Sequence, residues 1–287
     1  MIVTRTPFRI SFAGGGTDIK VFYKKKLGKV LSTTINKYLY VMVKKQPKFV
    51  EYKYRINWSK NEFVNSIEKI QNPIVRETLK YFKINYPIEI TTISDIPAQT
   101  GLGSSSAFAV GLVNALYALE GKKVSKYQIA KTAAYIEIER LKRFIGKQDH
   151  YSSTFGGLNI FTFYKNEKVK VEPINIKLNK KIDNCLSLFF TFKERDTHAG
   201  KVLEKQNLGA KKNNIELQEM LKDVEKCKKI FLKNKDLNGL GNILNKSWKF
   251  KLKNLKNSRM NYLNKIYNRA IKNGANGGKI LGAGNGG

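Results

Sequence analysis

The chain has 287 residues, of which 41% are hydrophobic and 26% charged, values typical of a globular protein with a sizeable core. Its formal net charge of +32 excludes an acidic surface and indicates anionic partners, either nucleotides and sugar phosphates or nucleic acid. Because the basic residues are mostly lysines spread along the chain, we favour a solvated basic surface over a nucleic-acid site.

Membrane, secreted and zinc-binding classes are disfavoured as well. No run of eighteen apolar residues is present, and the N-terminus lacks the apolar core of a secretion signal. Cys185 and Cys227 are single and far apart, which predicts a reducing, cytoplasmic location and no disulfide framework. With only His150 and His198, a zinc site is not expected. The sequence leaves the oligomeric state open, a homodimer included.

The first predicted element is a strand over residues 2–12, which contains Arg9 and leads into three glycines at 14–16. Thr17 and Asp18 follow at once, so a tight glycine turn holds a hydroxyl and a carboxylate side by side. Such a pair can bind a sugar, because a carboxylate accepts one or two hydrogen bonds from hydroxyl groups. The alternative is that Asp18 only caps the short helix that follows, and that Arg9 is a surface residue on an edge strand.

The central stretch, Pro97–Ala107, lies between a strand pattern over Ile88–Ile93 and an apolar helix pattern over Ala107–Leu119. Two glycines in it allow the backbone to approach a ligand closely. Free N–H groups and hydroxyls at a helix start suit a phosphate, although an ordinary Ser-capped helix is the alternative. The predicted phosphate loop consists of Gly101, Leu102, Gly103, Ser104, Ser105 and Ser106.

A helix pattern over Ser125–Phe144 carries two glutamates, Glu137 and Glu139, within its apolar face. A carboxylate near a bound nucleotide can hold Mg²⁺, which usually takes one or two carboxylates plus phosphate oxygens. The alternative is an exposed glutamate that pairs with Arg143, four residues after Glu139.

The segment Gly146–Gly157 is the second candidate for chemistry, because it contains Lys147 and Asp149. A sugar hydroxyl is a poor nucleophile, and an Asp within hydrogen-bond reach can accept its proton during phosphoryl transfer. Lys147 can stabilise that carboxylate and contact a phosphate. The alternative is that Asp149 is an ordinary turn residue.

The C-terminal part is predicted to be a second domain, with its boundary near Pro173. An apolar strand over Leu186–Phe192 precedes the polar segment with Arg195, a candidate for a second substrate phosphate whose alternative is a surface salt bridge. Three amphipathic helices follow, and a short strand over residues 279–281 leads into a glycine loop at 282–287.

Taken together, the three glycine loops, in this order and spacing, resemble the GHMP small-molecule kinases over residues 2–287. The Arg9…Asp18 form and Gly146-Lys-Gln-Asp149 look most like the heptose phosphate kinases of that superfamily. The resemblance implies an α+β fold of two domains: a mixed-sheet domain over residues 1–173 and a ferredoxin-like α/β domain over 174–287. In the family the third loop continues into another strand, so we expect the second domain to lack its last strand.

The resemblance also assigns roles to residues. ATP would lie between the domains, with its phosphates on the loop at 101–106 and on Gly282 and Gly284. Asp149 would be the catalytic carboxylate, with Arg9 either activating the acceptor or holding phosphate. Ser105 and Glu139 would bind Mg²⁺, because Ile138-Glu139-Arg140 fits the family's pattern better than Glu137 does. The substrate would be bound by Gly15, Gly16, Thr17, Asp18, Lys147 and Arg195.

The implied function is that of an ATP-dependent sugar kinase. The most specific expectation is phosphorylation of the anomeric hydroxyl of D-glycero-D-manno-heptose 7-phosphate, in nucleotide-heptose synthesis for a bacterial surface glycan. A galactokinase- or fucokinase-like enzyme is the first alternative. A nucleic-acid-binding protein is the second, and it gives the three glycine loops no role. We expect neither a nucleic acid nor a membrane as partner.

Overall fold

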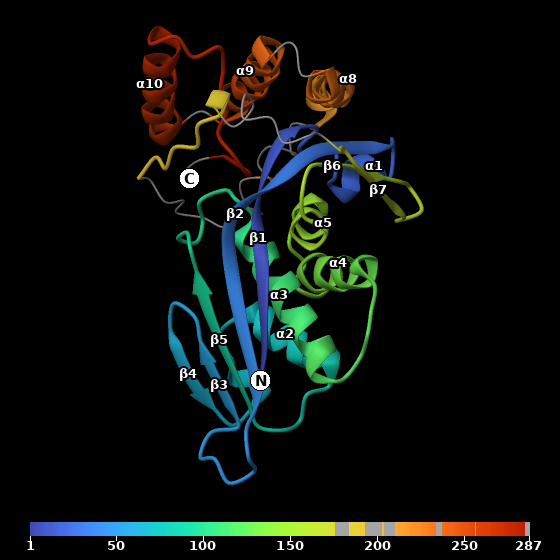
Figure 1. The fold of residues 1–287 in the computed structure, drawn as a ribbon, viewed down its shortest axis with the longest axis vertical. Helices are drawn as coiled ribbons and strands as arrows, with labels where there is room; N and C mark the ends of the chain where they lie inside the picture. Colours follow the sequence, from blue (N-terminus) through green and yellow to red (C-terminus); the bar gives the residue numbers. More distant parts are fainter. Residues whose placement is uncertain (176–183, 193–202, 204–209, 234–236, 256, 285–287) are drawn as a thin grey trace.

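The computed structural model describes residues 1–175, 184–192, 203, 210–233, 237–255 and 257–284 (Figure 1). Within these ranges, none of the helices combines the length and apolarity that crossing a bilayer requires.

The described residues form a seven-stranded sheet with the order β4–β3–β5–β2–β6–β7, and β1 pairs with β2. All pairs are antiparallel except β3 with β5. The central strand β2 serves both halves of the sheet, because its residues 39–45 pair with β5 and its residues 28–32 with β6. The strands are β1 (Ile2–Ala13), β2 (Gly28–Lys45), β3 (Tyr54–Asn57), β4 (Asn61–Val64), β5 (Ile88–Ser94), β6 (Asn159–Phe163) and β7 (Val169–Pro173).

Helices cover one face of this sheet and gather at one end of the molecule (Figure 1). The short elements of the first part are α1 (Lys20–Tyr23), the 3-10 turn η1 (Ile67–Lys69) and the π-helical turn η2 (Ile136–Arg140). Its longer helices are α2 (Pro73–Phe82), α3 (Ser104–Leu119), α4 (Lys126–Tyr135) and α5 (Gln148–Phe155). The C-terminal helices are α8 (Ala210–Lys233), α9 (Leu237–Asn254) and α10 (Ser258–Lys272).

The buried helix α3 fixes the centre of the main core. Its apolar residues, such as Leu112 and Leu116, are fully buried between the sheet and α2. At Gly111 the helix lies so close to β1 that a Cβ would come within 2.9 Å of Thr6 Oγ1. The Thr4 hydroxyl donates to the Gly111 carbonyl at 2.9 Å, which ties helix to strand. This packing fixes where the N-terminus of α3 lies.

A break in β1 brings that strand to the start of α3. Pro7 has no N–H to donate to the ladder, and the β1–β2 register shifts between Pro7 and Arg9. The Arg9 N–H instead donates to the Leu102 carbonyl at 3.1 Å. The first and second predicted loops are therefore joined through the backbone of Arg9.

The C-terminal helices pack on the far end of the sheet. Phe12 of β1 contacts Phe231 of α8, with ring centroids 5.1 Å apart, in a core that also contains Val224 and Ile243. The mixed sheet and this helical layer confirm the predicted α+β class. The predicted strands at 186–192 and 279–281 are wrong: both segments are irregular, and neither has a pairing strand among the described residues. Phe189 and Phe192 are exposed there, so an apolar run alone did not indicate a sheet.

Candidate active site

The start of α3 has the features that favour an anion. Its N-cap is Gly103, at φ +82°, so no side chain caps the helix. The N–H of Ala107 donates to the Gly103 carbonyl at 2.9 Å, and the amides of the three preceding serines come before this first helical bond. Free amides and the positive end of the helix dipole favour a phosphate at this point.

Arg9 and Asp149 form a bidentate ion pair directly beside this terminus. Arg9 Nε and Nη2 lie 2.7 Å from Oδ1 and Oδ2 of Asp149, and Arg9 Nη1 donates to the Gly101 carbonyl at 2.7 Å. A Cβ on Gly103 would lie 3.4 Å from both Arg9 Cγ and Asp149 Oδ2. The Arg9 side chain is 4% exposed and that of Asp149 22%, so the carboxylate faces solvent while the arginine is locked in place.

Asp18 fastens the glycine turn at residues 14–16 to α5. Its Oδ1 accepts from the Gly16 N–H at 3.0 Å and from Gln148 Nε2 at 3.1 Å, and its Oδ2 accepts from the Gln148 N–H at 3.0 Å. Burial raises the pKa of Asp18 to about 6, and the nearby Asp149 charge adds to the rise, although the backbone hydrogen bonds lower it. Gly146 must be glycine, because a Cβ there would lie 1.8 Å from Asp18 Oδ2.

Thr17, predicted to bind substrate, is fully buried, and its hydroxyl forms hydrogen bonds with backbone groups. Its hydroxyl oxygen lies 2.7 Å from the Gly14 carbonyl oxygen and 2.8 Å from that of Lys29, shares its one proton between them, and accepts from the Lys29 N–H at 3.1 Å. The neighbouring Gly15 and Gly16 are only partly buried, so these two residues of the turn can face a ligand.

Ser105 is paired with Glu137 and not with Glu139, which corrects the pairing predicted from the sequence. Ser105 Oγ donates to Glu137 Oε1 at 2.5 Å, and Arg143 Nη1 contacts both atoms, at 2.7 and 2.5 Å. Glu139 lies on the surface, where its carboxylate binds Lys20 Nζ at 2.6 Å. Residues two apart on a helix point about 200° from each other, so only one of the two glutamates can face the core.

Glu137 is held as a charged group in a buried cluster. Burial alone would raise its pKa, but the hydrogen bond and charge of His150, together with Arg143 and Ser105, lower the pKa to about 2. His150 Nε2 lies 2.8 Å from Glu137 Oε2, and its Nδ1 has no partner among the described residues. The imidazole therefore donates its Nε2 proton to the carboxylate.

Ser105 and Glu137 bring a hydroxyl and a carboxylate together near the start of α3, and such oxygens could hold Mg²⁺. The described residues contain no cluster of three or more His, Cys, Asp or Glu side chains, so a protein-only metal cage is not seen there. A hydroxyl and one carboxylate at a phosphate-binding helix start fit Mg²⁺, which keeps waters and phosphate oxygens as its other ligands. Arg143 now bridges the same two oxygens.

The sequence analysis expected Lys147 to stabilise the Asp149 carboxylate, but the structure shows Lys147 elsewhere. Its ammonium forms an ion pair with Glu167 and lies 4.9 Å above the ring of Tyr23. The cation next to Asp149 is Arg9 instead. Arg195, the other predicted phosphate contact, lies outside the described residues.

The third glycine loop meets the first residues of the phosphate loop. A Cβ on Gly282, at φ +63°, would lie 2.8 Å from both Gly101 Cα and the Gly101 carbonyl oxygen, and one on Gly101 would lie 2.6 Å from the Leu281 carbonyl oxygen. Lys251 of α9 holds this loop, since its Nζ donates to the carbonyls of Ile280 and Gly282 at 2.7 and 2.6 Å. Gly284, at φ +92°, packs near Leu255.

Several residues of the site were missed by sequence reasoning. Lys251 has no motif around it, and nothing in the chain indicates that it reaches Gly282. His150 directly follows Asp149 in a motif that was recognised, so its position was a signal for Glu137 that went unused. Arg143 was considered only as the partner of Glu139.

Comparison with known proteins shows the family to which the chain belongs. Residues 67–157 match the model of the GHMP kinases N terminal domain. The whole chain is 33% identical over 300 residues to a D-glycero-alpha-D-manno-heptose 7-phosphate kinase from Campylobacter jejuni, of which it covers 87%. The chain belongs to the GHMP kinase family. Members of this family are ATP-dependent phosphotransferases, and the predicted enzyme class is confirmed.

Solved structures of two kinases share this fold. A putative sugar kinase from Campylobacter jejuni is 30% identical, with a TM-score of 0.67 over 99% of this chain and 85% of the other. A D-glycero-D-manno-heptose 1-phosphate kinase from Bacteriodes thetaiotaomicron is 24% identical, with a TM-score of 0.70 over 99% of this chain and 86% of the other. This second likeness is one of fold.

Proposed function

We propose that this GHMP kinase transfers the γ-phosphoryl group of ATP to a sugar phosphate, with the anomeric hydroxyl of D-glycero-D-manno-heptose 7-phosphate as the acceptor. The similarity to the heptose 7-phosphate kinase of Campylobacter jejuni supports the substrate. The Arg9–Asp149 pair against the start of α3 supports the reaction and is the observation on which the proposal depends.

In this proposal the loop at 101–106 and the amides at the start of α3 hold the ATP phosphates, and the glycine loop at Gly282 covers them. Ser105 and Glu137 would hold Mg²⁺, which would neutralise negative charge on the phosphates. Gly15 and Gly16 would form the floor on which the sugar lies, and Asp18 would hold this turn through the Gly16 N–H.

In the proposed reaction Asp149 would accept the proton of the acceptor hydroxyl. Both of its oxygens receive an N–H of Arg9, but each keeps a second lone pair, and the side chain is reachable from solvent. Arg9 holds the carboxylate in one orientation and adds positive charge where the transferred phosphoryl group is negative. Catalysis would then come mostly from positioning and charge neutralisation.

The test is a coupled ADP-release assay with ATP and Mg²⁺ on a panel of acceptors. We expect turnover on D-glycero-D-manno-heptose 7-phosphate, and a product phosphorylated at the anomeric position by ³¹P NMR. Efficient turnover on galactose or fucose instead would keep the phosphotransferase but overturn the heptose substrate.

A further inference from the structure

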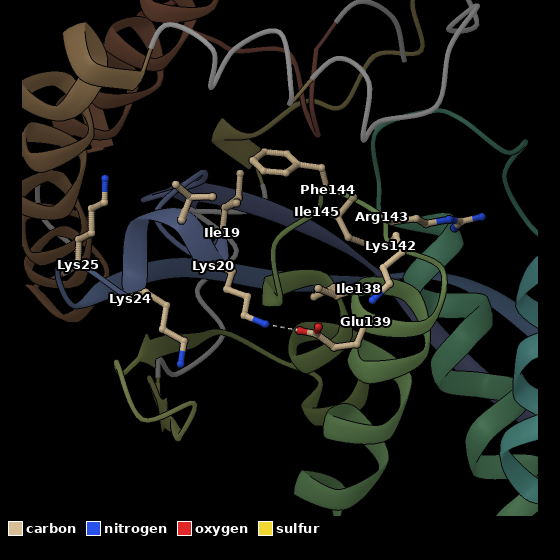
Figure 2. A pocket seen from close by; sticks show the side chains of 11 residues that line it. Ile19, Lys20, Lys24, Lys25, Ile138, Glu139, Lys142, Arg143, Phe144 and Ile145 are labelled. Atoms are coloured by element: carbon tan, nitrogen blue, oxygen red, sulfur yellow. Dashed lines mark hydrogen bonds and ion pairs between the residues drawn. The ribbon is translucent and has the colours of Figure 1, made fainter.

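A hollow in the protein surface begins at Ile19, directly after Asp18. It has a volume of about 480 Å³ and is formed by α1 on one side and by η2 with the segment before α5 on the other. Figure 2 shows Lys20, Lys24 and Lys25 on the first wall and Glu139 and Lys142 on the second. Pockets of this size accommodate a small molecule rather than a duplex or a protein surface.

Both walls of the hollow continue from residues of the active site. Lys20 is two residues after Asp18, a stretch of chain that spans at most about 7 Å. On the other wall Ile145 precedes Gly146, which touches Asp18, and Asp149 follows three residues later. A ligand that extends from Asp149 into this hollow would pass along these two short stretches of chain.

The charge in the hollow is strongly positive. Five basic side chains line it, and Glu139 is the carboxylate among the lining residues. Arg143 is bound to Glu137, Lys24 to Glu167 and Lys20 to Glu139. Lys25 and Lys142 have no ion-pair partner within the part of the chain that the structure describes.

Two features indicate that an anionic ligand with a carbon chain fits this hollow. Its apolar lining, which includes Ile19, Ile138 and Phe144, can pack against carbon atoms. Lys142 has a left-handed backbone conformation, at φ +52°, which is unfavourable for a residue with a side chain. The surrounding structure holds this lysine at the hollow in spite of that strain.

We propose that this hollow binds the phosphate monoester at the far end of the acceptor, with Lys20 and Lys142 as its contact residues. The inference rests on the proposed function, because it takes the acceptor hydroxyl to be at Asp149. Glu139 forms an ion pair with Lys20 across the hollow (Figure 2). The site explains how the enzyme would prefer a sugar phosphate to a neutral sugar although Lys147 is engaged by Glu167.

The experiment compares binding of D-glycero-D-manno-heptose 7-phosphate and of the unphosphorylated heptose by calorimetry, without ATP. We expect the full-length protein to bind the sugar phosphate at least tenfold more tightly than the heptose. The double variant Lys20→Ala/Lys142→Ala should lose most of that difference while binding the neutral heptose as before. Lys131→Ala, on the exposed side of α4, removes one charge away from the hollow and should bind both ligands like the wild type.

A second variant separates binding from folding. Lys142→Gly removes the same charge but suits the left-handed backbone, so it should fold at least as stably as the wild type and still bind the sugar phosphate several-fold more weakly. Wild-type affinity for the sugar phosphate in both variants would overturn the pocket, and turnover of that substrate would then leave the proposed function standing. Lysine-dependent binding of the sugar phosphate without turnover would support the pocket and overturn the proposed function.

Discussion

At the scale of single residues, the two glutamates of the η2 turn have opposite environments. Glu137 is fully buried and contacts Ser105, Arg143 and His150. Glu139 forms a surface pair with Lys20, in which the side chains are 41% and 45% exposed. An exposed pair of this kind contributes about 1 kcal/mol or less, whereas breaking a buried pair costs about 3–5 kcal/mol.

We therefore expect Glu137→Gln and Glu139→Gln to differ sharply. Glu137→Gln should lower the free energy of unfolding by about 2 kcal/mol or more and abolish the Mg²⁺-dependent gain in ATP affinity. Glu139→Gln, the matched control, should change stability by less than about 1 kcal/mol and keep that gain. Urea unfolding and ATP titrations with and without Mg²⁺ measure both. The reverse pattern would restore Glu139 as the metal ligand.

The raised pKa of Asp18 predicts how the free energy of unfolding depends on pH. Its pKa is raised from 3.8 to about 6 in the folded protein, so ionisation costs folded-state stability as the pH rises from about 4 to 6. A shift of about two pKa units corresponds to about 3 kcal/mol. Relative to Asp18→Asn, the wild type should lose stability over that window and no further above it.

Urea unfolding of both proteins at pH 4, 5, 6 and 7 checks this, because groups that titrate equally in the two proteins cancel in the difference. A difference in unfolding free energy that stays constant over the series would show that folding does not raise the pKa of Asp18.

At the scale of elements, the contact between the second and third glycine loops should control ATP binding. Ala at position 282 would place a Cβ 2.8 Å from the backbone of Gly101. We expect Gly282→Ala to weaken ATP binding at least tenfold. Gly121→Ala is the matched control, because Gly121 is also left-handed, at φ +67°, but nothing lies within 4 Å of a Cβ there. Its cost should be limited to about 1 kcal/mol of stability, with ATP affinity unchanged. Equal ATP affinity of the two variants would contradict a role for this contact.

The elements also show which parts of the fold can be predicted from the sequence. The helix after Gly103 was predicted because its apolar residues and glycine turn are local signals. The strand over 186–192 was wrong, because an apolar run shows only that burial is favourable and a strand also needs a pairing partner. Glu137 could not be assigned either: the helix pattern continues through Phe144, whereas the structure changes to a π-helical turn at Ile136.

At the scale of the whole molecule, the site joins residues that are far apart in the chain. Arg9 and Asp149 were both predicted as catalytic, but their bidentate contact spans 140 residues and is set by the packing of β1, α3 and α5. No local pattern encodes that contact. The net charge of +32 indicated anionic ligands, and the basic hollow beside Asp18 gives part of that charge a defined place.

The most direct measurement on the central claim is the rate of ADP release by Asp149→Asn, together with its affinity for ATP. If Asp149 accepts the proton of the acceptor, the variant should bind ATP within about threefold of the wild type and lose about 10²- to 10⁴-fold in kcat. A rate close to that of the wild type would remove Asp149 from the reaction and contradict the Arg9–Asp149 site as the catalytic centre.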